Sequence, residues 1–331
     1  MLPRIALLAT GGTIASQETA QGLMPKTGAK GILDFMPSLS ERARITARDV
    51  FMLDSSNIQP EEWQLLAQAV LEAADQSDGI VITHGTDTLA YSAAALSFML
   101  LGINIPVVFT GSQLPLTHPF SDAPGNLREA FAMAASGRPG VFVAFQHKVI
   151  YGTRAVKMRT LGFDAFDSIN MPPVGFFDAD GLHLSPDPRG CGPFEIPDPI
   201  KIDPRVFLLK MMPGTSPGIL DHILASGYRG LVLEAFGIGG LHYIRRNLIE
   251  KLQELGEKGV ITLVTTQCLY EKADFTLYEV GRGLISEGIY GAHDMTTESA
   301  VTKLMWVLGD SKTRRNFITR CVSHEMLTAG E

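Results

Sequence analysis

The sequence predicts two α/β domains, a larger N-terminal one with a mostly parallel sheet and flanking helices, and a smaller C-terminal one. Short apolar runs alternate with amphipathic segments, the pattern of a parallel sheet covered on both faces. The 331 residues are enough for two separate cores. A stretch rich in proline and glycine with little periodicity, residues 186–205, is typical of a linker. We therefore expect domains at 1–185 and 206–331.

The first half of the chain carries the clearer alternation. Short apolar runs predict strands at Ile5–Ala9, Val50–Leu53, Gly79–Thr83, Pro106–Thr110 and Val141–Phe145. Amphipathic segments predict helices near Pro60–Ala74, Thr88–Leu101 and Asn126–Ala135. The helix at Pro60 begins with proline and has acids in its first turn, both favourable there. Gly175–Leu184 contains Asp-Gly between apolar residues, which indicates a hairpin.

The alternation resumes after the linker. It predicts strands at Val206–Lys210, Gly230–Ala235 and Val260–Thr265, and helices at Gly218–Ala225, Tyr243–Leu255, Thr297–Leu308 and Thr313–Cys321. These elements are fewer than in the first half, so the second domain is expected to be the smaller.

Composition excludes several classes of protein. The net charge of −7 and the lack of basic runs argue against a nucleic-acid partner. The N-terminus has only about seven apolar residues before a glycine pair, too few for a membrane span, and lacks a signal peptide's features. We read it as the first core strand of a cytoplasmic protein. The three cysteines, Cys191, Cys268 and Cys321, follow no metal spacing, and no HExxH occurs, so we expect no metal.

Four predicted strands end in turns rich in hydroxyl groups: "LLATGGTIAS", "LDSSN", "VITHGTDT" and "VFTGSQ". Ligands of open α/β sheets collect outside the carboxyl ends of the strands. If the strands are neighbours, one crevice collects Thr13, Ser55, Ser56, Thr86, Asp87 and Ser112. Glycines in these turns, Gly11, Gly12, Gly85 and Gly111, let the backbone approach a ligand and expose N–H groups. One such turn is commonly structural, but four together favour a binding site.

Some features have plainer explanations. Asp87 lies near a helix start, where the dipole favours an acid, and Lys157 can be a solvated surface lysine. His84 follows an apolar strand and is expected to be a structural histidine. "GTSPG" (residues 214–218) matches the G-x-S-x-G nucleophile turn, but Pro217 lacks the N–H that this motif needs. We therefore reject a serine hydrolase, and "ATGGTIAS" lacks the G-x-G-x-x-G spacing of a dinucleotide site.

Two motifs carry a family resemblance. "TGGTIA" (Thr10–Ala15) and "HGTDT" (His84–Thr88) resemble the two signature segments of the bacterial-type L-asparaginases. Further matches span nearly the whole chain and most resemble the cytoplasmic, type I branch: "LDSSNIQPEEWQ", "AYSAAALSFML", "TGSQLPL", "GFDAF", "TTQC" and "YEVGR". The resemblance implies hydrolysis of L-asparagine to L-aspartate and ammonia without a cofactor.

The resemblance also implies residue roles. Thr13 would be the nucleophile, and Thr86, Asp87 and Lys157 would form a second group across the substrate. The α-carboxylate and α-amino groups would be held by Ser55, Ser56 and Asp87, with Ser112 beside them. The chemistry agrees, because a threonine hydroxyl needs a neighbour to take its proton, and Lys157 can accept one through Thr86. Backbone N–H groups at Gly12 and Gly85 can stabilise an oxyanion.

Two positions depart from the family pattern. Many members carry a tyrosine where Leu23 stands, in the segment Ser16–Lys30 that we expect to act as a lid. Tyr270 is either its substitute, reaching in from a neighbouring subunit, or a packing residue. Many members also carry asparagine where Gly240 stands.

The family pattern implies a homodimer or homotetramer, because one subunit's C-terminal domain completes another's site. Two alternatives to asparagine hydrolysis stay open. One is an amidohydrolase acting on glutamine or on an asparaginyl unit of a peptide or tRNA. The other is a catalytically silent sensor of aspartate or asparagine.

Overall fold

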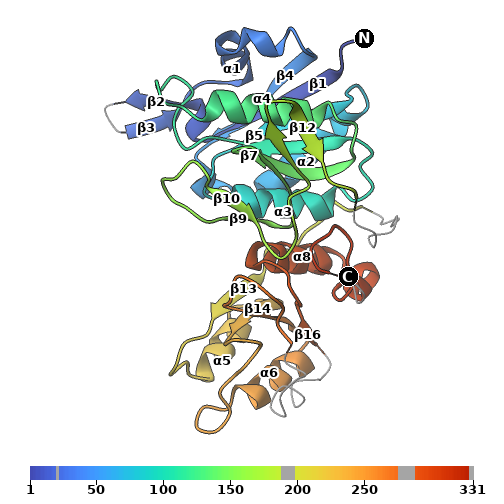
Figure 1. Cartoon of the computed structure of the whole chain (residues 1–331). Coiled ribbons are helices and arrows are strands. Elements are labelled where there is room, and N and C mark those ends of the chain that lie inside the picture. The colour runs from blue at the N-terminus through green and yellow to red at the C-terminus, as the bar shows by residue number, and fades with distance from the viewer. Residues whose placement is uncertain (20–21, 188–197, 275–287, 328–331) are drawn as a thin grey trace. The chain divides into compact units, whose positions relative to one another are not determined.

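A computed structural model describes residues 1–19, 22–187, 198–274 and 288–327 (Figure 1). Its contacts form two compact units. Unit 1 holds the described residues up to 187 together with 198–200, and unit 2 holds those from 201 onward. Each unit contains a sheet with helices, so the predicted pair of α/β domains is confirmed. The predicted linker at 186–205 stays a prediction, because residues 188–197 lie outside the described residues.

Unit 1 is built on an eight-stranded sheet with the order β12-β11-β8-β7-β6-β5-β1-β4. Its strands are β1 (Arg4–Gly11), β4 (Arg44–Leu53), β5 (Gly79–Thr83), β6 (Pro106–Thr110), β7 (Gly140–Phe145), β8 (Lys148–Tyr151), β11 (Gly175–Asp178) and β12 (Gly181–Leu184). The strands from β7 to β4 run parallel, whereas β8, β11 and β12 extend the sheet in antiparallel fashion. The parallel strands have their carboxyl ends at one edge, where the predicted turns lie.

Helices cover both faces of this sheet. They are α1 (Ala29–Phe35), α2 (Pro60–Ala74), α3 (Leu89–Met99) and α4 (Ala123–Ala134). The helices α1 and α4 share a core with one face, and Figure 1 shows α4 on the opposite side of the sheet from α2 and α3. The helix α2 begins as predicted, with Pro60 in its first turn and a capping box between Gln59 and Glu62. The helix α3 is buried on nearly every side, which explains its apolar circumference.

The sequence does not predict strands that are very short or that carry mostly polar side chains. The strand β4 begins at Arg44 rather than Val50, because an edge strand can expose polar side chains and then shows no apolar run. Two small antiparallel pairs were also not predicted, β2 (Ser16–Thr19) with β3 (Gly22–Pro25) and β9 (Ala155–Lys157) with β10 (Phe166–Ser168). The first pair lies within the segment expected to be a lid.

Unit 2 has a parallel sheet of four strands with the order β13-β14-β15-β16. The strands are β13 (Val206–Lys210), β14 (Gly230–Ala235), β15 (Ile261–Thr266) and β16 (Ile289–Gly291). The helices are α5 (Gly218–Ala225), α6 (Leu248–Glu257), α8 (Thr297–Gly309) and α9 (Ser311–Arg314). Figure 1 shows α5 and α6 on one face of the strands and α8 on the other.

Two predicted helices of unit 2 were wrong in extent. The helix α6 begins at Leu248 instead of Tyr243, because the Asn247 side chain accepts the N–H of Ile249 and caps the helix there. The predicted helix Thr313–Cys321 is only the single turn α9 followed by a 3-10 turn at Arg315–Phe317. The reason is tertiary: the fully buried guanidinium of Arg314 donates to carbonyls in two other segments, which tethers the chain there.

A fully buried ion pair anchors the last described segment to α8. The Lys303 Nζ donates to Glu325 Oε1 at 2.6 Å and to the Arg320 carbonyl at 2.7 Å, and both charged side chains have 0% exposure. Glu325 also accepts the backbone N–H groups of Val322 and Ser323. Each charge therefore has a partner, as burial requires.

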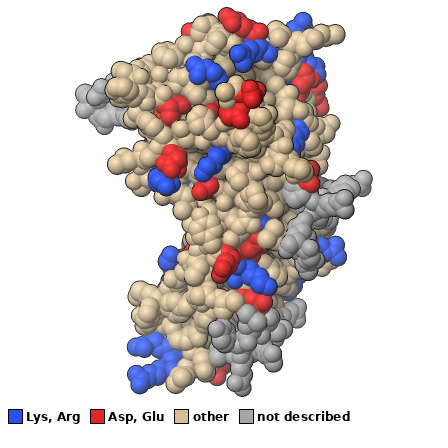
Figure 2. Space-filling view, in the orientation of Figure 1, with Lys and Arg blue, Asp and Glu red and all other residues tan. Residues whose placement is uncertain are grey.

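The surface and the helix lengths bear on the expected partners. Figure 2 shows basic side chains interspersed with acidic ones over most of the face in view, without a broad basic stripe. Within the described residues, none of the helices combines the length and the apolar character that a membrane crossing demands.

Candidate functional site

The turns after β1, β4 and β5 touch one another through glycine backbone. Gly12 has a positive φ of 77°, and a Cβ on it would lie only 2.3 Å from the Gly85 Cα. A Cβ on Gly11 would lie 2.3 Å from the Leu53 carbonyl oxygen, and the Gly12 N–H donates to that same carbonyl at 2.9 Å. Glycine is thus required here by close approach and by left-handed backbone. The structure brings these three predicted turns together.

Three further contacts complete the cluster. A Cβ on Gly85 would lie 2.6 Å from the Ser55 Oγ, which places that buried hydroxyl against the "HGTDT" turn. A Cβ on Gly111 would lie 2.4 Å from the His84 carbonyl, so the turn after β6 joins as well. The Thr88 hydroxyl donates to the Ser55 carbonyl at 2.7 Å and ties the turns after β4 and β5. All four predicted turns therefore form one contiguous group.

Lys157 reaches this group from outside the parallel strands. It ends the short strand β9, and its Nζ donates to Thr86 Oγ1 at 2.8 Å and to Asp87 Oδ1 at 2.6 Å. The Lys157 side chain is 18% exposed, whereas that of Asp87 is 65% exposed. Lys157 is therefore not a solvated surface lysine, because its ammonium is mostly covered and bonded to Thr86 and Asp87. Asp87 also lies directly before Thr88, the N-cap of α3, as its plainer explanation expects.

Thr13 begins a 3-10 turn, Thr13–Ala15, directly after the glycine pair. Its side chain is partly exposed, and among the described residues its hydroxyl has no hydrogen bond. The turn itself is held by Ser16, whose hydroxyl donates to the Gly12 carbonyl at 2.9 Å and whose N–H donates to the Thr13 carbonyl. A fixed backbone thus presents a hydroxyl that is available to a ligand.

The remaining serines of the prediction differ in their surroundings. Ser56 is exposed, and both its N–H and its hydroxyl donate to the Asp54 carboxylate. Ser112 has 0% exposure, and its hydroxyl donates to the Leu114 carbonyl. The Ser112 hydroxyl is therefore engaged within its own turn, and its predicted part in substrate binding has no support from this geometry.

His84 has the surroundings of a structural histidine. It is fully buried, its Nδ1–H donates to the Gly85 carbonyl at 2.8 Å, and its ring packs edge-on against Phe109. Burial lowers the pKa of His84 to about 4, because the charged form would lose its hydration. The imidazole is therefore neutral near pH 7, and it supports the turn from its buried side.

One side chain of the group was missed from the sequence. The Gln113 Oε1 accepts a hydrogen bond from Thr86 Oγ1 at 3.2 Å, and its Nε2 donates to the Thr160 and Gly162 carbonyls at 3.1 Å each. Gln113 stands in "VFTGSQ", one of the four predicted turns, whose prediction rests on hydroxyl groups. A neutral amide has no sequence signal that distinguishes it from a surface glutamine.

Three residues bear on the two departures from the family pattern. Tyr270 belongs to unit 2 and is 54% exposed, and its place at the Thr13 site stays a prediction. Leu23 lies in β3 opposite Glu18. A Cβ on Gly240 would meet the Phe236 carbonyl at 3.4 Å, an ordinary contact, so the backbone does not require glycine there. The matching segment "YEVGR" (278–282) lies outside the described residues.

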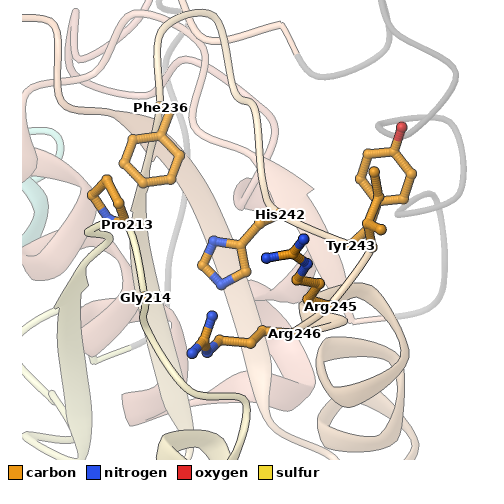
Figure 3. Close-up of a pocket in the computed structure, with 8 residues that line it drawn as sticks. Pro213, Gly214, Phe236, His242, Tyr243, Arg245 and Arg246 are labelled. Atoms are coloured by element: carbon orange, nitrogen blue, oxygen red, sulfur yellow. The ribbon is translucent and has the colours of Figure 1, made fainter.

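A pocket of about 580 Å³ lies in unit 2, in loops that follow β13 and β14 (Figure 3). It is lined by Pro213, Gly214, Phe236, His242, Tyr243, Ile244, Arg245 and Arg246. The His242 Nε2 donates to the Thr215 carbonyl at 2.9 Å. None of the predicted site residues lines this pocket. Across the ranges that the structure describes, no cluster of three or more His, Cys, Asp or Glu side chains suits a metal ion.

Comparison with known proteins identifies the family. The family model "Asparaginase, N-terminal" matches residues 4–189, and "Glutaminase/Asparaginase C-terminal domain" matches residues 205–319. The L-asparaginase of Thermococcus kodakarensis is 46% identical over 93% of this chain and 94% of its own length. A glutamyl-tRNA(Gln) amidotransferase component of Pyrococcus abyssi is 35% identical over 94% of this chain and 73% of its own length.

Solved structures show the same relationship. The thermostable L-asparaginase from Thermococcus kodakarensis superimposes with a TM-score of 0.90 at 43% identity, covering 98% of this chain and 100% of that one. L-asparaginase I from Vibrio cholerae gives a TM-score of 0.86 at 30% identity, covering 99% and 100%. With both family models matched in order along the chain, and with these identities over almost its whole length, the chain belongs to the asparaginase family.

Proposed function

We propose that this chain hydrolyses L-asparagine to L-aspartate and ammonia, with Thr13 as the nucleophile. The observation that carries the proposal is the Lys157 ammonium, 2.8 Å from Thr86 Oγ1 and 2.6 Å from Asp87 Oδ1, beside the turn that presents Thr13. The relatives named L-asparaginase support the choice of substrate. The reaction needs no cofactor, because each proton transfer has a side chain or a water to serve it.

Substrate recognition follows from charge. An α-amino acid presents an ammonium and a carboxylate, so its site needs an acid and a set of hydrogen-bond donors. The Asp87 carboxylate is 65% exposed and can bind the ammonium. The buried hydroxyl of Ser55 beside Gly85, with the exposed Ser56, can serve the carboxylate.

The chemistry proceeds in two balanced steps. The Thr13 oxygen attacks the side-chain amide carbon, the C–N bond breaks, and the Thr13 proton leaves with the nitrogen as ammonia. Water then attacks the ester of Thr13, one of its protons returns to the threonine oxygen, and L-aspartate is released. Backbone N–H groups of the glycine turns stabilise the oxyanion formed in each step, except that of Gly12, which already donates to the Leu53 carbonyl.

Thr86 and Lys157 move the protons in this scheme. In the free protein the Lys157 Nζ donates to both Thr86 and Asp87. A substrate ammonium bound to Asp87 competes with Lys157 for that carboxylate and thereby favours the amine form of Lys157. The amine can then take a proton through the Thr86 hydroxyl.

Replacing Lys157 tests the proposal. We expect Lys157→Met to lower kcat for ammonia release from L-asparagine by about 10²–10⁴-fold, the usual contribution of general acid–base catalysis. The matched control is Lys148→Met, which breaks a comparable pair with Asp167 (2.9 Å) in the same unit and should keep kcat within about twofold. Release from glutamine is measured in parallel.

The other outcomes point to the alternatives. If the wild-type protein releases ammonia from glutamine but not from asparagine, it is an amidohydrolase that acts on glutamine. One that binds aspartate or asparagine without any turnover is a sensor. Undiminished turnover in Lys157→Met contradicts the proton relay.

We also propose a cytoplasmic homodimer or homotetramer with shared active sites. The location is supported by similarity to a protein named probable cytoplasmic L-asparaginase from Campylobacter jejuni. The assembly is proposed from the family pattern, in which one subunit's C-terminal domain completes another's site. Large apolar side chains are exposed in each unit: Phe120 (79%) and Leu161 (86%) in unit 1, and Met212 (64%), Ile244 (83%) and Tyr270 (54%) in unit 2.

Mixing a weakened variant with an inactive one tests the shared sites. If Tyr270 enters the site of a neighbouring subunit, Tyr270→Phe should reduce kcat about tenfold, since it loses one hydrogen bond to the nucleophile. A mixture of Tyr270→Phe with inactive Thr13→Ala should then regain part of the activity after subunit exchange, because mixed oligomers contain some sites with both native residues. If mass spectrometry verifies that subunits have exchanged and no activity is recovered, a site completed by Tyr270 is contradicted.

A further inference from the structure

The side-chain amide of Gln113 joins Thr86 to the segment that follows Lys157. Its oxygen faces the Thr86 hydroxyl at 3.2 Å, and its nitrogen faces the carbonyls of Thr160 and Gly162. Carbonyl oxygens only accept, so the amide nitrogen must face Thr160 and Gly162, and the amide oxygen must face Thr86. The amide has a single orientation that satisfies all three contacts.

The backbone that carries Gln113 is held by the start of α4. The N–H groups of Gln113 and Leu114 both donate to the Asp122 carboxylate, at 3.0–3.1 Å. Asn126 donates from its Nδ2 to Asp122 and to the Gly111 carbonyl. Both ends of the 111–114 turn are therefore anchored, and the side chain of Gln113 starts from a fixed position.

These contacts determine where the Thr86 proton points. The Lys157 ammonium only donates, so Thr86 Oγ1 accepts from it. The Gln113 oxygen only accepts, so the Thr86 hydroxyl hydrogen points toward Gln113 in the free protein. A relay to the amine form of Lys157 requires this hydrogen to turn from Gln113 toward Nζ. The strength of the hydrogen bond from Thr86 to Gln113 therefore governs how readily the Thr86 hydroxyl turns to Lys157 and forms the proton relay.

We propose that Gln113 is a positioning residue of the reaction, which orients the Thr86 hydroxyl and couples it to the 160–162 segment. This inference rests on the proposed function of the site. Gln113 acts through Thr86 rather than on the substrate. Its effect should therefore appear in kcat and in the pH profile, with KM little changed.

Two variants separate orientation from structural support. In Gln113→Met both the acceptor and the donors are lost, and we expect kcat to fall about tenfold with KM within about twofold. In Gln113→Glu an oxygen still accepts from Thr86, but a negative charge is added near Lys157. That charge favours the ammonium, and the relay needs the amine, so the acidic limb of the kcat profile should move to higher pH by about one unit.

Gln267→Met is the matched control for losing a glutamine side chain that supports two backbone carbonyls. The Gln267 Nε2 also bridges two carbonyls, those of Met211 (2.6 Å) and Glu234 (3.1 Å), but in unit 2. We expect Gln267→Met to lower the melting temperature about as much as Gln113→Met and to leave the position of the acidic limb unchanged. Melting temperatures are recorded for every variant, so that kcat can be compared with folding.

The outcomes are decisive in both directions. A shifted acidic limb in Gln113→Glu, with reduced kcat in Gln113→Met, supports the inference. The inference is overturned if the acidic limb of Gln113→Glu is unshifted, or if kcat of Gln113→Met lies within twofold of wild type. In either case a wild type that is active on asparagine still upholds the proposed function. A wild type that releases no ammonia from asparagine overturns the proposed function first, and this inference with it.

Discussion

Replacing Thr13 by alanine is expected to abolish ammonia release from L-asparagine and to leave the free energy of unfolding nearly unchanged. The hydroxyl is partly exposed and makes no hydrogen bond among the described residues, so its removal should cost within about 0.5 kcal/mol. The chemistry has no other first nucleophile, so kcat should fall by about 10⁴-fold or more. Steady-state ammonia release and urea unfolding measure the two effects.

A neighbouring hydroxyl provides the control for Thr13→Ala. Ser16→Ala removes a buried hydroxyl that donates to the Gly12 carbonyl at 2.9 Å in the same turn. That variant should lose about 1 kcal/mol of stability and retain turnover, which is the opposite pattern. Activity that survives in Thr13→Ala but disappears in Thr86→Val would reassign the nucleophile to Thr86.

The largest effect on stability is expected at the buried pair of Lys303 and Glu325. Lys303→Met should lower the free energy of unfolding of unit 2 by about 3–5 kcal/mol, because it leaves the Glu325 carboxylate buried without its counter-charge. Adding Glu325→Gln removes that charge while keeping an oxygen for the N–H groups of Val322 and Ser323. The double variant should therefore be more stable than Lys303→Met alone.

The two tryptophans allow this measurement on unit 2 alone. Trp306 is fully buried in α8 of unit 2, and Trp63 lies in α2 of unit 1. In a Trp63→Phe background, the fluorescence of Trp306 follows urea unfolding of the unit that holds the ion pair. If Lys303→Met proves as stable as its background, or if the double variant is the least stable of the three, the assignment of the loss to an unpaired buried charge is wrong.

Apolar periodicity located most strands of both sheets, but not the short strands β8 and β16. The strands β5, β6, β13 and β14 and the helices α2 and α5 have the predicted bounds, since each is a buried run or an amphipathic segment with a clear start and end. The sequence also indicated which turns would matter, because hydroxyl groups and glycines followed four strands that proved to be neighbours. The roles of Lys157 and Thr13 came from family resemblance rather than from any pattern.

The elements that the prediction missed have little local signal. The strand β9, which carries Lys157, has three residues, and β10 also has three, too short to show a period. The helix predicted at Thr313–Cys321 fails because a buried guanidinium, that of Arg314, donates to the Lys201 carbonyl, 113 residues away in sequence, and to the Trp306 carbonyl, 8 residues away. Local preference cannot reveal such contacts, because their energy comes from partners more than a few residues distant.

The sequence by itself determined the class of fold, the positions of most main strands along the chain and the polar turns that follow four of them. Those features follow from the spacing of apolar side chains and from the conformational freedom of glycine, which are properties of short stretches. Only the tertiary structure decided that Gly12 and Gly85 touch, that Lys157 meets Thr86 and Asp87, and that Gln113 directs the Thr86 hydroxyl. Each of these contacts joins residues from different strands or turns, and hydrogen bonds act over about 3 Å, so they exist only after the chain has folded.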